Sequence, residues 1–256
     1  GDTGKAALEG FKDVDGTGVT VFYPSDGVSP MQKLQMMTQE GGNVHVAAIR
    51  GNFDDAQTAV KAAFTDKTLI DALQKSGKAF SSANSINFGR LVPQIVYYFS
   101  AYLDILDAGR VQEGGKVNFV VPTGNFGNIL AGYYAMRMGL PVGKLICASN
   151  RNNVLTEFFR EGQYDARREF FKTQSPSMDI LVSSNLERLL FEIAGRDDGL
   201  TAKRMAELKG NGAYTITDSE RAALNELFWA GYADEDATAA AIADVFDEYE
   251  YVVDPH

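Results

Sequence analysis

The residues best suited to chemistry form a short turn rich in glycine and asparagine. An apolar run from Val117 ends at Pro122-Thr123, the turn reads Gly124-Asn125-Phe126-Gly127-Asn128, and a helical pattern begins at Ile129. Glycines let a backbone bend sharply and bring its N–H groups close to a ligand. Together with the positive end of the following helix, these groups favour an anion, usually a phosphate. An ordinary strand-to-helix turn is the alternative explanation.

A second polar segment, Ser81 to Arg90, reads SSANSINFGR and precedes a long apolar stretch. Asn84 and Ser85 offer neutral hydrogen bonds, and Arg90 offers a planar cation. Together these groups suit a small anionic ligand. A capped loop before a core helix, with Arg90 in solvent, explains the same composition.

Asp2 and Thr3 stand at the start of the chain, just before a helical pattern that begins at Lys5. Both side chains can accept backbone N–H bonds, so either residue is predicted to cap this helix. The helix then directs its N-terminus at whatever lies beside Asp2 and Thr3. Capping alone would account for both residues.

Strands and helices alternate through most of the sequence. Strands are predicted at 19–23 and 44–49 and helices at 29–37 and 54–64, which indicates an α/β fold with parallel sheets covered by helices. The later predicted elements are a helix at 91–106, the strand from Val117, a helix at 131–138 and a strand at 142–148. Beyond Gly199 the pattern predicts only helices, at 202–208, 219–229 and 236–249, with Ser219 as a cap and 251–253 as a candidate final strand.

Composition restricts the class of protein. The 256 residues carry a net charge of −10, which argues against a nucleic-acid partner or an anionic membrane surface. One cysteine, Cys147, excludes an internal disulfide and fits a cytoplasmic protein, and with two histidines it argues against a His/Cys metal site. The chain starts at Gly1 and stops at His256, and we expect both ends to be cut from something longer.

Four segments, in one order, resemble threonine synthase, a fold-type II pyridoxal-phosphate enzyme with a two-lobed, tryptophan synthase β-like architecture. They are Gly1-Asp2-Thr3-Gly4, the block Tyr23-Pro24-Ser25-Asp26-Gly27-Val28-Ser29-Pro30-Met31-Gln32, Ser82-Ala83-Asn84-Ser85-Ile86-Asn87 with Arg90, and Gly124-Asn125-Phe126-Gly127-Asn128. Ser184-Asn185-Leu186-Glu187-Arg188 and Asp254-Pro255-His256 are similar to that family too, so the resemblance covers essentially the whole chain.

The resemblance implies a role for each matched residue. Gly124 to Asn128 match the loop that holds the cofactor phosphate. Asn84, Ser85 and Arg90 match the groups that bind the phosphate of O-phospho-L-homoserine, a dianion suited to charge-assisted donors. Asp2 and Thr3 match a loop beside the cofactor ring and the substrate carboxylate. Many relatives have Asn at the position of Asp2, and a carboxylate cannot donate, so the Asp2 backbone or Thr3 would have to donate instead.

The implied reaction converts O-phospho-L-homoserine and water to L-threonine and phosphate, a lyase step in threonine biosynthesis. In the family, the lysine that forms the Schiff base with the cofactor lies in a Phe-Lys-Asp context upstream of the Asp2-Thr3 loop. We expect it before Gly1, and interpret Phe11-Lys12-Asp13 as a coincidence of sequence. The chain alone is therefore expected to be inactive, with the remaining portion of the same enzyme as its partner.

The resemblance also implies a small lobe over residues 1–85 and a large lobe over 86–256 with a helical C-terminal extension, and a ligand cleft between them.

Three alternative functions remain. Another type II enzyme, such as a threonine dehydratase or a cysteine synthase, is the first, although such enzymes lack the set Asn84, Ser85 and Arg90. A threonine-synthase-like protein that binds phosphorylated ligands without turnover is a second. A nucleotide-binding protein is a weaker third, since the loop matches neither GxGxxG nor a Walker sequence.

Overall fold

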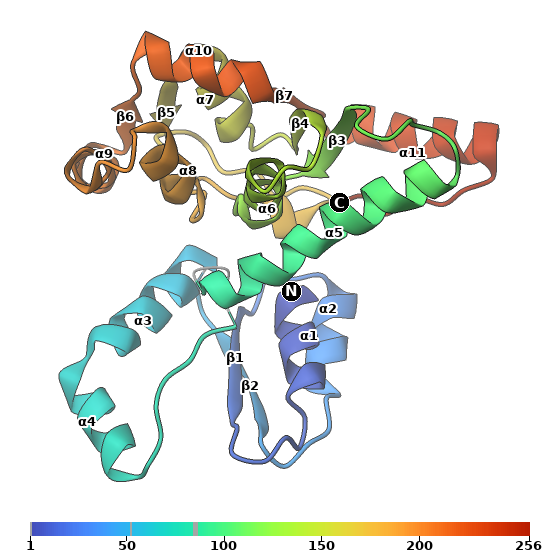
Figure 1. Ribbon diagram of the computed structural model, residues 1–256. Helices are drawn as coiled ribbons and strands as arrows, with labels where there is room; N and C mark the ends of the chain where they lie inside the picture. The colour runs from blue at the N-terminus through green and yellow to red at the C-terminus, as the bar shows by residue number, and fades with distance from the viewer. Residues whose placement is uncertain (1, 52, 84–86) are drawn as a thin grey trace. The chain divides into compact units, whose positions relative to one another are not determined.

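The computed structural model describes residues 2–51, 53–83 and 87–256. The chain divides into two compact units, Gly1–Asn84 and Ser85–His256, which we call the N-terminal and the C-terminal unit. The first runs from blue to cyan in Figure 1, and the second from green to red. Each unit contains a parallel sheet with helices, as the alternating pattern predicts.

The N-terminal unit is built on two parallel strands, β1 (Val19–Pro24) and β2 (Val44–Ile49). Figure 1 shows α1 and α2 on one side of this pair and α3 on the other. The helices are α1 (Asp2–Gly10), α2 (Pro30–Met37), α3 (Phe53–Thr65) and α4 (Lys67–Lys75). The predicted start of α2 is confirmed, because Ser29 and Gln32 form a reciprocal capping box ahead of Pro30.

Two details of this unit differ from the sequence prediction. Helix α1 already includes Asp2 and Thr3, so these residues form its first turn and do not cap a helix that begins at Lys5. Helix α4 was not predicted, although Asp66 caps it by accepting from the N–H groups of Thr68 and Leu69. Helix ends shift easily by one or two residues, which explains the first difference.

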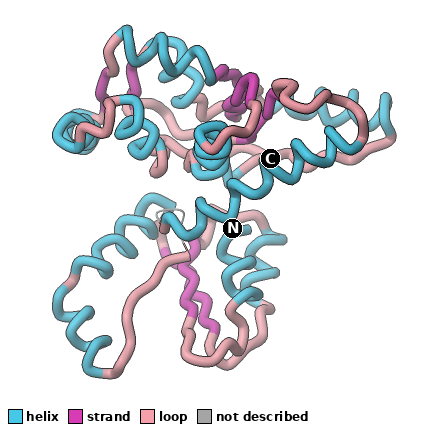
Figure 2. The backbone as a smooth tube through the Cα atoms, viewed as in Figure 1, coloured by secondary structure: helices cyan, strands magenta, loops and turns pink. Residues whose placement is uncertain are grey.

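The C-terminal unit is organised around the parallel sheet β3-β4-β7 (Figure 2). Its strands are β3 (Val117–Pro122), β4 (Val142–Ser149) and β7 (Phe228–Tyr232), and a separate antiparallel pair joins β5 (Gln163–Asp165) to β6 (Ala213–Thr215). The helices are α5 (Phe88–Asp107), α6 (Gly127–Arg137), α7 (Val154–Glu161), α8 (Leu186–Ile193), α9 (Asp198–Asn211), α10 (Asp218–Leu227) and α11 (Glu235–Tyr249), with the short helix η1 (Pro176–Met178).

The prediction that only helices follow Gly199 is wrong. The predicted helix 219–229 ends at Leu227, and Phe228 to Tyr232 form a strand that pairs with β4. Strand β6 also lies in this region, whereas residues 251–253 form no strand. The cap of α10 is Thr217, two residues before Ser219, since its hydroxyl accepts from the Glu220 N–H while the Glu220 carboxylate accepts from the Thr217 N–H.

The core of the C-terminal unit is one aromatic-rich cluster between the sheet and its helices. Its largest fully buried members include Phe126, Phe158, Tyr164, Phe228 and Leu145. Cys147 is buried on β4, as its apolar surroundings predict, and burial raises the pKa of its thiol to about 12. Within the described ranges, no helix is both long and apolar enough to cross a membrane.

Candidate phosphate-binding site

The Gly-Asn turn follows the carboxyl end of β3, as predicted, at the place where open parallel sheets bind ligands. The Thr123 N–H donates to the Ala148 carbonyl at 2.8 Å, which carries the pairing of β3 and β4 up to the turn. Phe126 then takes a left-handed backbone with φ of 62° immediately before α6. That conformation costs a non-glycine residue about 1–2 kcal/mol. Burial of the ring against Phe159 and Phe228, with 1% of Phe126 exposed, offsets this cost.

The backbone N–H groups of this turn are available to a ligand. In the described part of the chain, the amides from Gly124 to Ile129 have no hydrogen-bond partner, and the first bond of α6 runs from the Leu130 N–H to the Phe126 carbonyl. Gly124, Asn125, Gly127 and Asn128 are only half-buried. Unpaired N–H groups on half-buried residues at a helix N-terminus suit an oxyanion such as a phosphate.

The carbonyl groups of the turn are bound to protein on the opposite side. The Ser183 hydroxyl donates to the Gly124 carbonyl at 2.8 Å. The Asn125 carbonyl accepts from the Asn185 N–H at 3.1 Å and from its Nδ2 at 2.9 Å. Because these acceptors are engaged by the start of α8, the turn can present donors without leaving its carbonyls unpaired.

Gly124 has a specific reason to be glycine. A Cβ at this position would lie 3.1 Å from the Ser177 carbonyl oxygen and 3.2 Å from the Met178 Cα. Its φ is not positive, and the left-handed residue of the turn is Phe126. The glycine therefore permits close approach to a neighbouring backbone, which we call the back wall (residues 173–180).

The back wall is held by a buried polar network at the carboxyl end of β4. The Asp179 carboxylate accepts from Asn150 Nδ2 at 2.8 Å, Asn152 Nδ2 at 3.0 Å, the Thr173 hydroxyl at 2.7 Å and the Thr173 N–H at 3.0 Å. Asn150 and Asn152 are both buried. The carboxyl end of β4 therefore positions both parts of the site: it pairs with Thr123 ahead of the turn, and it holds the wall against which Gly124 packs.

Helix α5 contacts the turn from another direction. The Tyr98 hydroxyl lies 2.7 Å from Asn128 Oδ1 and 2.9 Å from the Asn128 carbonyl oxygen, and Asn128 Nδ2 donates to Gln94 Oε1 at 3.1 Å. Gly132 makes the contact possible, because a Cβ there would lie 2.7 Å from the Tyr98 ring. Burial of Tyr98 raises the pKa of its hydroxyl, which keeps it a donor.

The predicted substrate-phosphate residues are only partly described. Asn84 and Ser85 lie outside the described residues. Arg90 lies in the first turn of α5 and is half-buried, and desolvation lowers the pKa of its guanidinium while Tyr97 acts in the opposite direction. An arginine stays charged under these conditions, so Arg90 is a partly desolvated cation.

The remaining predicted residues belong to the N-terminal unit. Thr3 is exposed in the first turn of α1, and the side chain of Asp2 lies outside the description. Lys12 follows α1 on the surface, with its Nζ 3.9 Å from the Glu40 carboxylate.

Sequence reasoning missed the residues that support the turn. Gln94, Tyr98, Ser183 and Asn185 make the contacts described above, and none was predicted to contact the turn. Asn185 stood in a segment that carried the resemblance, which was the available signal. Gln94 follows Arg90 by one helical turn, so its spacing alone pointed to the same face of α5.

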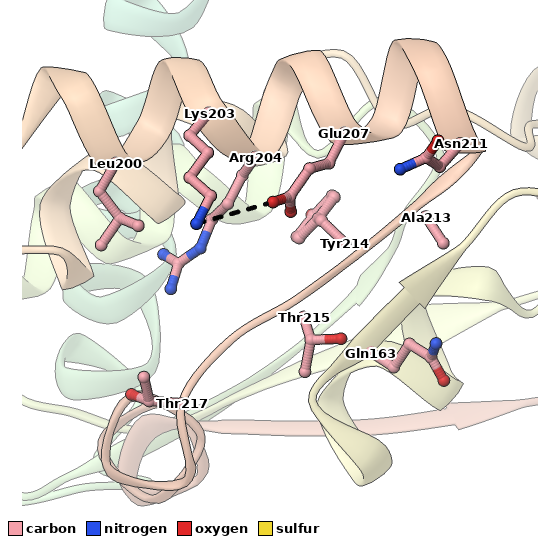
Figure 3. A pocket seen from close by; sticks show the side chains of 10 residues that line it. All are labelled: Gln163, Leu200, Lys203, Arg204, Glu207, Asn211, Ala213, Tyr214, Thr215 and Thr217. Atoms are coloured by element: carbon pink, nitrogen blue, oxygen red, sulfur yellow. Dashed lines mark ion pairs between the residues drawn. The ribbon is translucent and has the colours of Figure 1, made fainter.

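A separate pocket of about 470 Å³ lies between α9 and the β5-β6 pair. Figure 3 shows Lys203 and Glu207 projecting from α9, with Thr215 and Gln163 on the opposite wall. Arg204 lines it too, but both of its terminal nitrogens bind the Glu220 carboxylate, at 2.9 and 2.6 Å, and Lys203 pairs with Glu207 at 3.9 Å. Because its cations are paired, this pocket is a weaker phosphate site than the Gly124 turn.

The donor set fits the phosphate group of pyridoxal phosphate. The turn offers unpaired N–H groups, a helix N-terminus and a glycine held against a rigid wall, which together suit a dianionic phosphate. A metal site finds no such support, because the described residues contain no group of three or more His, Cys, Asp or Glu side chains able to hold a metal ion.

Known proteins resemble this chain along its whole length. It is 41% identical to threonine synthase from Pseudomonas aeruginosa and 43% identical to threonine synthase-like 1 from Homo sapiens. The crystal structure of threonine synthase from Brucella melitensis with bound PLP matches with a TM-score of 0.87 and 45% identity. Each comparison covers 100% of this chain but only 52%, 35% and 53% of the relative, respectively. The chain thus spans about half the length of these threonine synthases.

The family model described as pyridoxal-phosphate dependent enzyme matches residues 1–245. The parallel sheets, the helices that cover them and the turn from Gly124 to Asn128 agree with that match. The chain therefore belongs to the family of pyridoxal-phosphate dependent enzymes.

Proposed function

We propose that the protein containing this chain is a threonine synthase, which converts O-phospho-L-homoserine and water to L-threonine and phosphate. The observation that carries the proposal is the row of unpaired N–H groups from Gly124 to Ile129, in a chain matched over its full length by threonine synthases. It would be a lyase of threonine biosynthesis, and its one buried cysteine fits the cytoplasm.

Gly124 to Asn128 would hold the cofactor phosphate through their backbone amides. Pyridoxal phosphate, when bound, supplies an electron sink for carbanions, and the protein supplies orientation and proton positions. In this chain, the back wall and α8 fix the turn that receives the phosphate. Asp2, through its backbone, would lie beside the cofactor ring, and Thr3 beside the substrate carboxylate.

Arg90, with Asn84 and Ser85, would bind the phosphate of the substrate. A planar guanidinium can donate two parallel hydrogen bonds to phosphate oxygens, and partial burial strengthens this interaction. This set separates the proposed substrate from unphosphorylated serine or threonine. We propose that residues 1–85 and 86–256 are the small and the large lobe of such an enzyme.

The activity would belong to the whole protein. The resemblance assigns the catalytic lysine to a position before Gly1, and Lys12 pairs with Glu40 on the surface. We therefore propose that residues 1–256 alone bind phosphate but do not turn over substrate, and that the rest of the same polypeptide completes the site.

A second candidate is a related protein that binds phosphorylated ligands without turnover. Its support is that the 43% identity to threonine synthase-like 1 lies between the 41% and 45% identities to the threonine synthases of Pseudomonas aeruginosa and Brucella melitensis.

The test uses protein expressed from the complete reading frame. It would be incubated with pyridoxal phosphate, reduced with borohydride, and assayed for phosphate release from O-phospho-L-homoserine. We expect a trapped lysine upstream of Gly1 and release of phosphate. A trapped lysine without phosphate release would favour the second candidate, activity with unphosphorylated serine or threonine would favour another type II enzyme, and an adduct on Lys12 would refute the assignment of the lysine.

A further inference from the structure

Gln94 contacts both predicted phosphate-binding groups of the C-terminal unit. Its Oε1 accepts from Asn128 Nδ2 at 3.1 Å, and its Nε2 donates to the Arg90 carbonyl at 2.6 Å. The side chain is half-buried in the second turn of α5. One amide thus binds the turn assigned to the cofactor and the backbone of the residue assigned to the substrate.

The Asn128 side chain has a defined orientation because of this contact. Its Oδ1 accepts from the buried Tyr98 hydroxyl and its Nδ2 donates to Gln94. A flipped Asn128 amide would place its oxygen against Gln94 Oε1, where two acceptors repel each other. Asn128 lies in the first turn of α6, so its orientation fixes the end of the row of N–H groups.

The Arg90 contact reinforces a weak turn of α5. Pro93 has no N–H, so the helix lacks the bond that residue 93 would donate to the carbonyl of residue 89. The bond from Gln94 Nε2 to the Arg90 carbonyl adds a hydrogen bond to the same turn. The backbone that carries the guanidinium is thereby held at a fixed distance from Asn128.

We infer that Gln94 is a positioning residue that couples the cofactor-phosphate turn to the substrate-phosphate arginine, through Asn128 on one side and the Arg90 backbone on the other. This inference rests on the proposed function for the identity of the two ligands. Gln94 touches neither ligand in this role, and acts by holding the groups that do.

The test compares two substitutions in the complete protein. Gln94→Met removes both hydrogen bonds and keeps the length of the side chain. Gln94→Glu keeps an acceptor for Asn128 but removes the donor to the Arg90 carbonyl. Gln74→Met, at an exposed position of α4, is the matched control.

Three quantities would be measured. They are the dissociation constant of pyridoxal phosphate from absorbance titration of the apo-protein, amide hydrogen exchange without cofactor at 130–132, the first hydrogen-bonded amides of α6, and KM and kcat with O-phospho-L-homoserine. For Gln94→Met we expect both the dissociation constant and KM to rise about 3–10-fold, as for the loss of one hydrogen bond at each site. Exchange at 130–132 should be faster, and kcat should stay within about twofold, since Gln94 binds no reacting atom.

Gln94→Glu separates the two sides of the contact. We expect its KM to rise like that of Gln94→Met, while its dissociation constant for pyridoxal phosphate stays within about twofold of the wild type. The inference would be overturned if Gln94→Met had the same dissociation constant, amide exchange and KM as Gln74→Met. A Gln94→Glu protein that loses cofactor affinity but keeps its KM would also overturn it.

Failure of the proposed function remains distinguishable. If the wild type releases no phosphate from O-phospho-L-homoserine, the proposed reaction is wrong, but pyridoxal-phosphate affinity and amide exchange still test the Asn128 side. Titration with inorganic phosphate in place of substrate then tests the Arg90 side, with the same expected ratio between Gln94→Met and wild type.

Discussion

The two units bury their interiors in different ways. Among the described residues, the N-terminal unit has a buried cluster of Leu8, Tyr23 and Met36, with valines of β1 and β2 packed against it. The C-terminal unit has a continuous cluster rich in aromatic residues, and it also binds its buried asparagines in a hydrogen-bonded network. A small buried interior contributes little free energy of unfolding, so we expect local unfolding to occur more readily in the N-terminal unit than in the C-terminal unit. The turn from Gly124 to Asn128 lies in the unit with the larger interior.

The largest expected effect is in the C-terminal unit, at the buried ion pair of Arg204 and Glu220. The side chain of Arg204 is 4% exposed and that of Glu220 11%, and Glu220 also binds Thr217 in the capping box of α10. Glu220→Ala would leave a buried cation unpaired, and we expect a loss of about 3–5 kcal/mol in the free energy of unfolding. Chemical denaturation would measure it. A loss below that of Glu226→Ala, an exposed control, would show that the pair is not needed.

The next effect tests the small interior directly. Leu8 is fully buried against β1 and α2, and Leu8→Ala should cost about 2–4 kcal/mol. Because this unit has little reserve, hydrogen exchange should accelerate throughout residues 2–83 and change little in the C-terminal unit. Met31→Ala, at an exposed position of α2, is the control. Equal acceleration in both units would contradict a difference in local stability.

A smaller effect is expected at the back wall. Gly124→Ala places a methyl group 3.1 Å from the Ser177 carbonyl oxygen, and overpacking against backbone should cost about 1–3 kcal/mol. Affinity for pyridoxal phosphate should fall as well, since the turn must move. Gly210→Ala in α9, where a Cβ meets nothing within 4 Å, should instead stabilise the protein by about 0.5–1 kcal/mol. If Gly124→Ala retains wild-type cofactor affinity, contact with the back wall does not determine the binding conformation of the turn.

The smallest effect is a dependence on pH. Burial alone would raise the pKa of Glu220, but its hydrogen bonds to Arg204 and Thr217 outweigh burial and lower that pKa below the ordinary 4.5. A lowered folded-state pKa gives stability that is present above about pH 4.5 and is lost as the pH falls through the folded-state value. Denaturation midpoints between pH 6 and pH 3 should therefore fall less steeply in Glu220→Gln than in the wild type. Parallel curves for the two proteins would exclude Glu220 as a source of acid sensitivity.

Local sequence predicted those features that depend on neighbours along the chain. The start of α2, the bounds of β2 and the strand-turn-helix around Gly124 were all confirmed. Strand β7 was missed because Phe228 to Tyr232 continue the apolar pattern of α10, and only pairing with β4 makes them extended. The Gln94–Asn128 contact was equally hidden, since it joins residues 34 positions apart. The roles of all the predicted site residues stay predictions, namely Asp2, Thr3, Asn84, Ser85, Arg90 and Gly124 to Asn128.

The left-handed backbone of Phe126 has a consequence for the order of synthesis. Its strain is offset by contact with Phe159 and Phe228, and Phe228 lies far downstream in β7. While a ribosome is still making the intervening helices, the turn has been synthesised but lacks the Phe228 ring, one of the two that stabilise its conformation. The proposed affinity of the nascent chain for phosphate should therefore arise late, only after β7 has emerged and docked. Binding of a ligand would then follow the completion of the sheet, and it would not assist the early formation of the sheet.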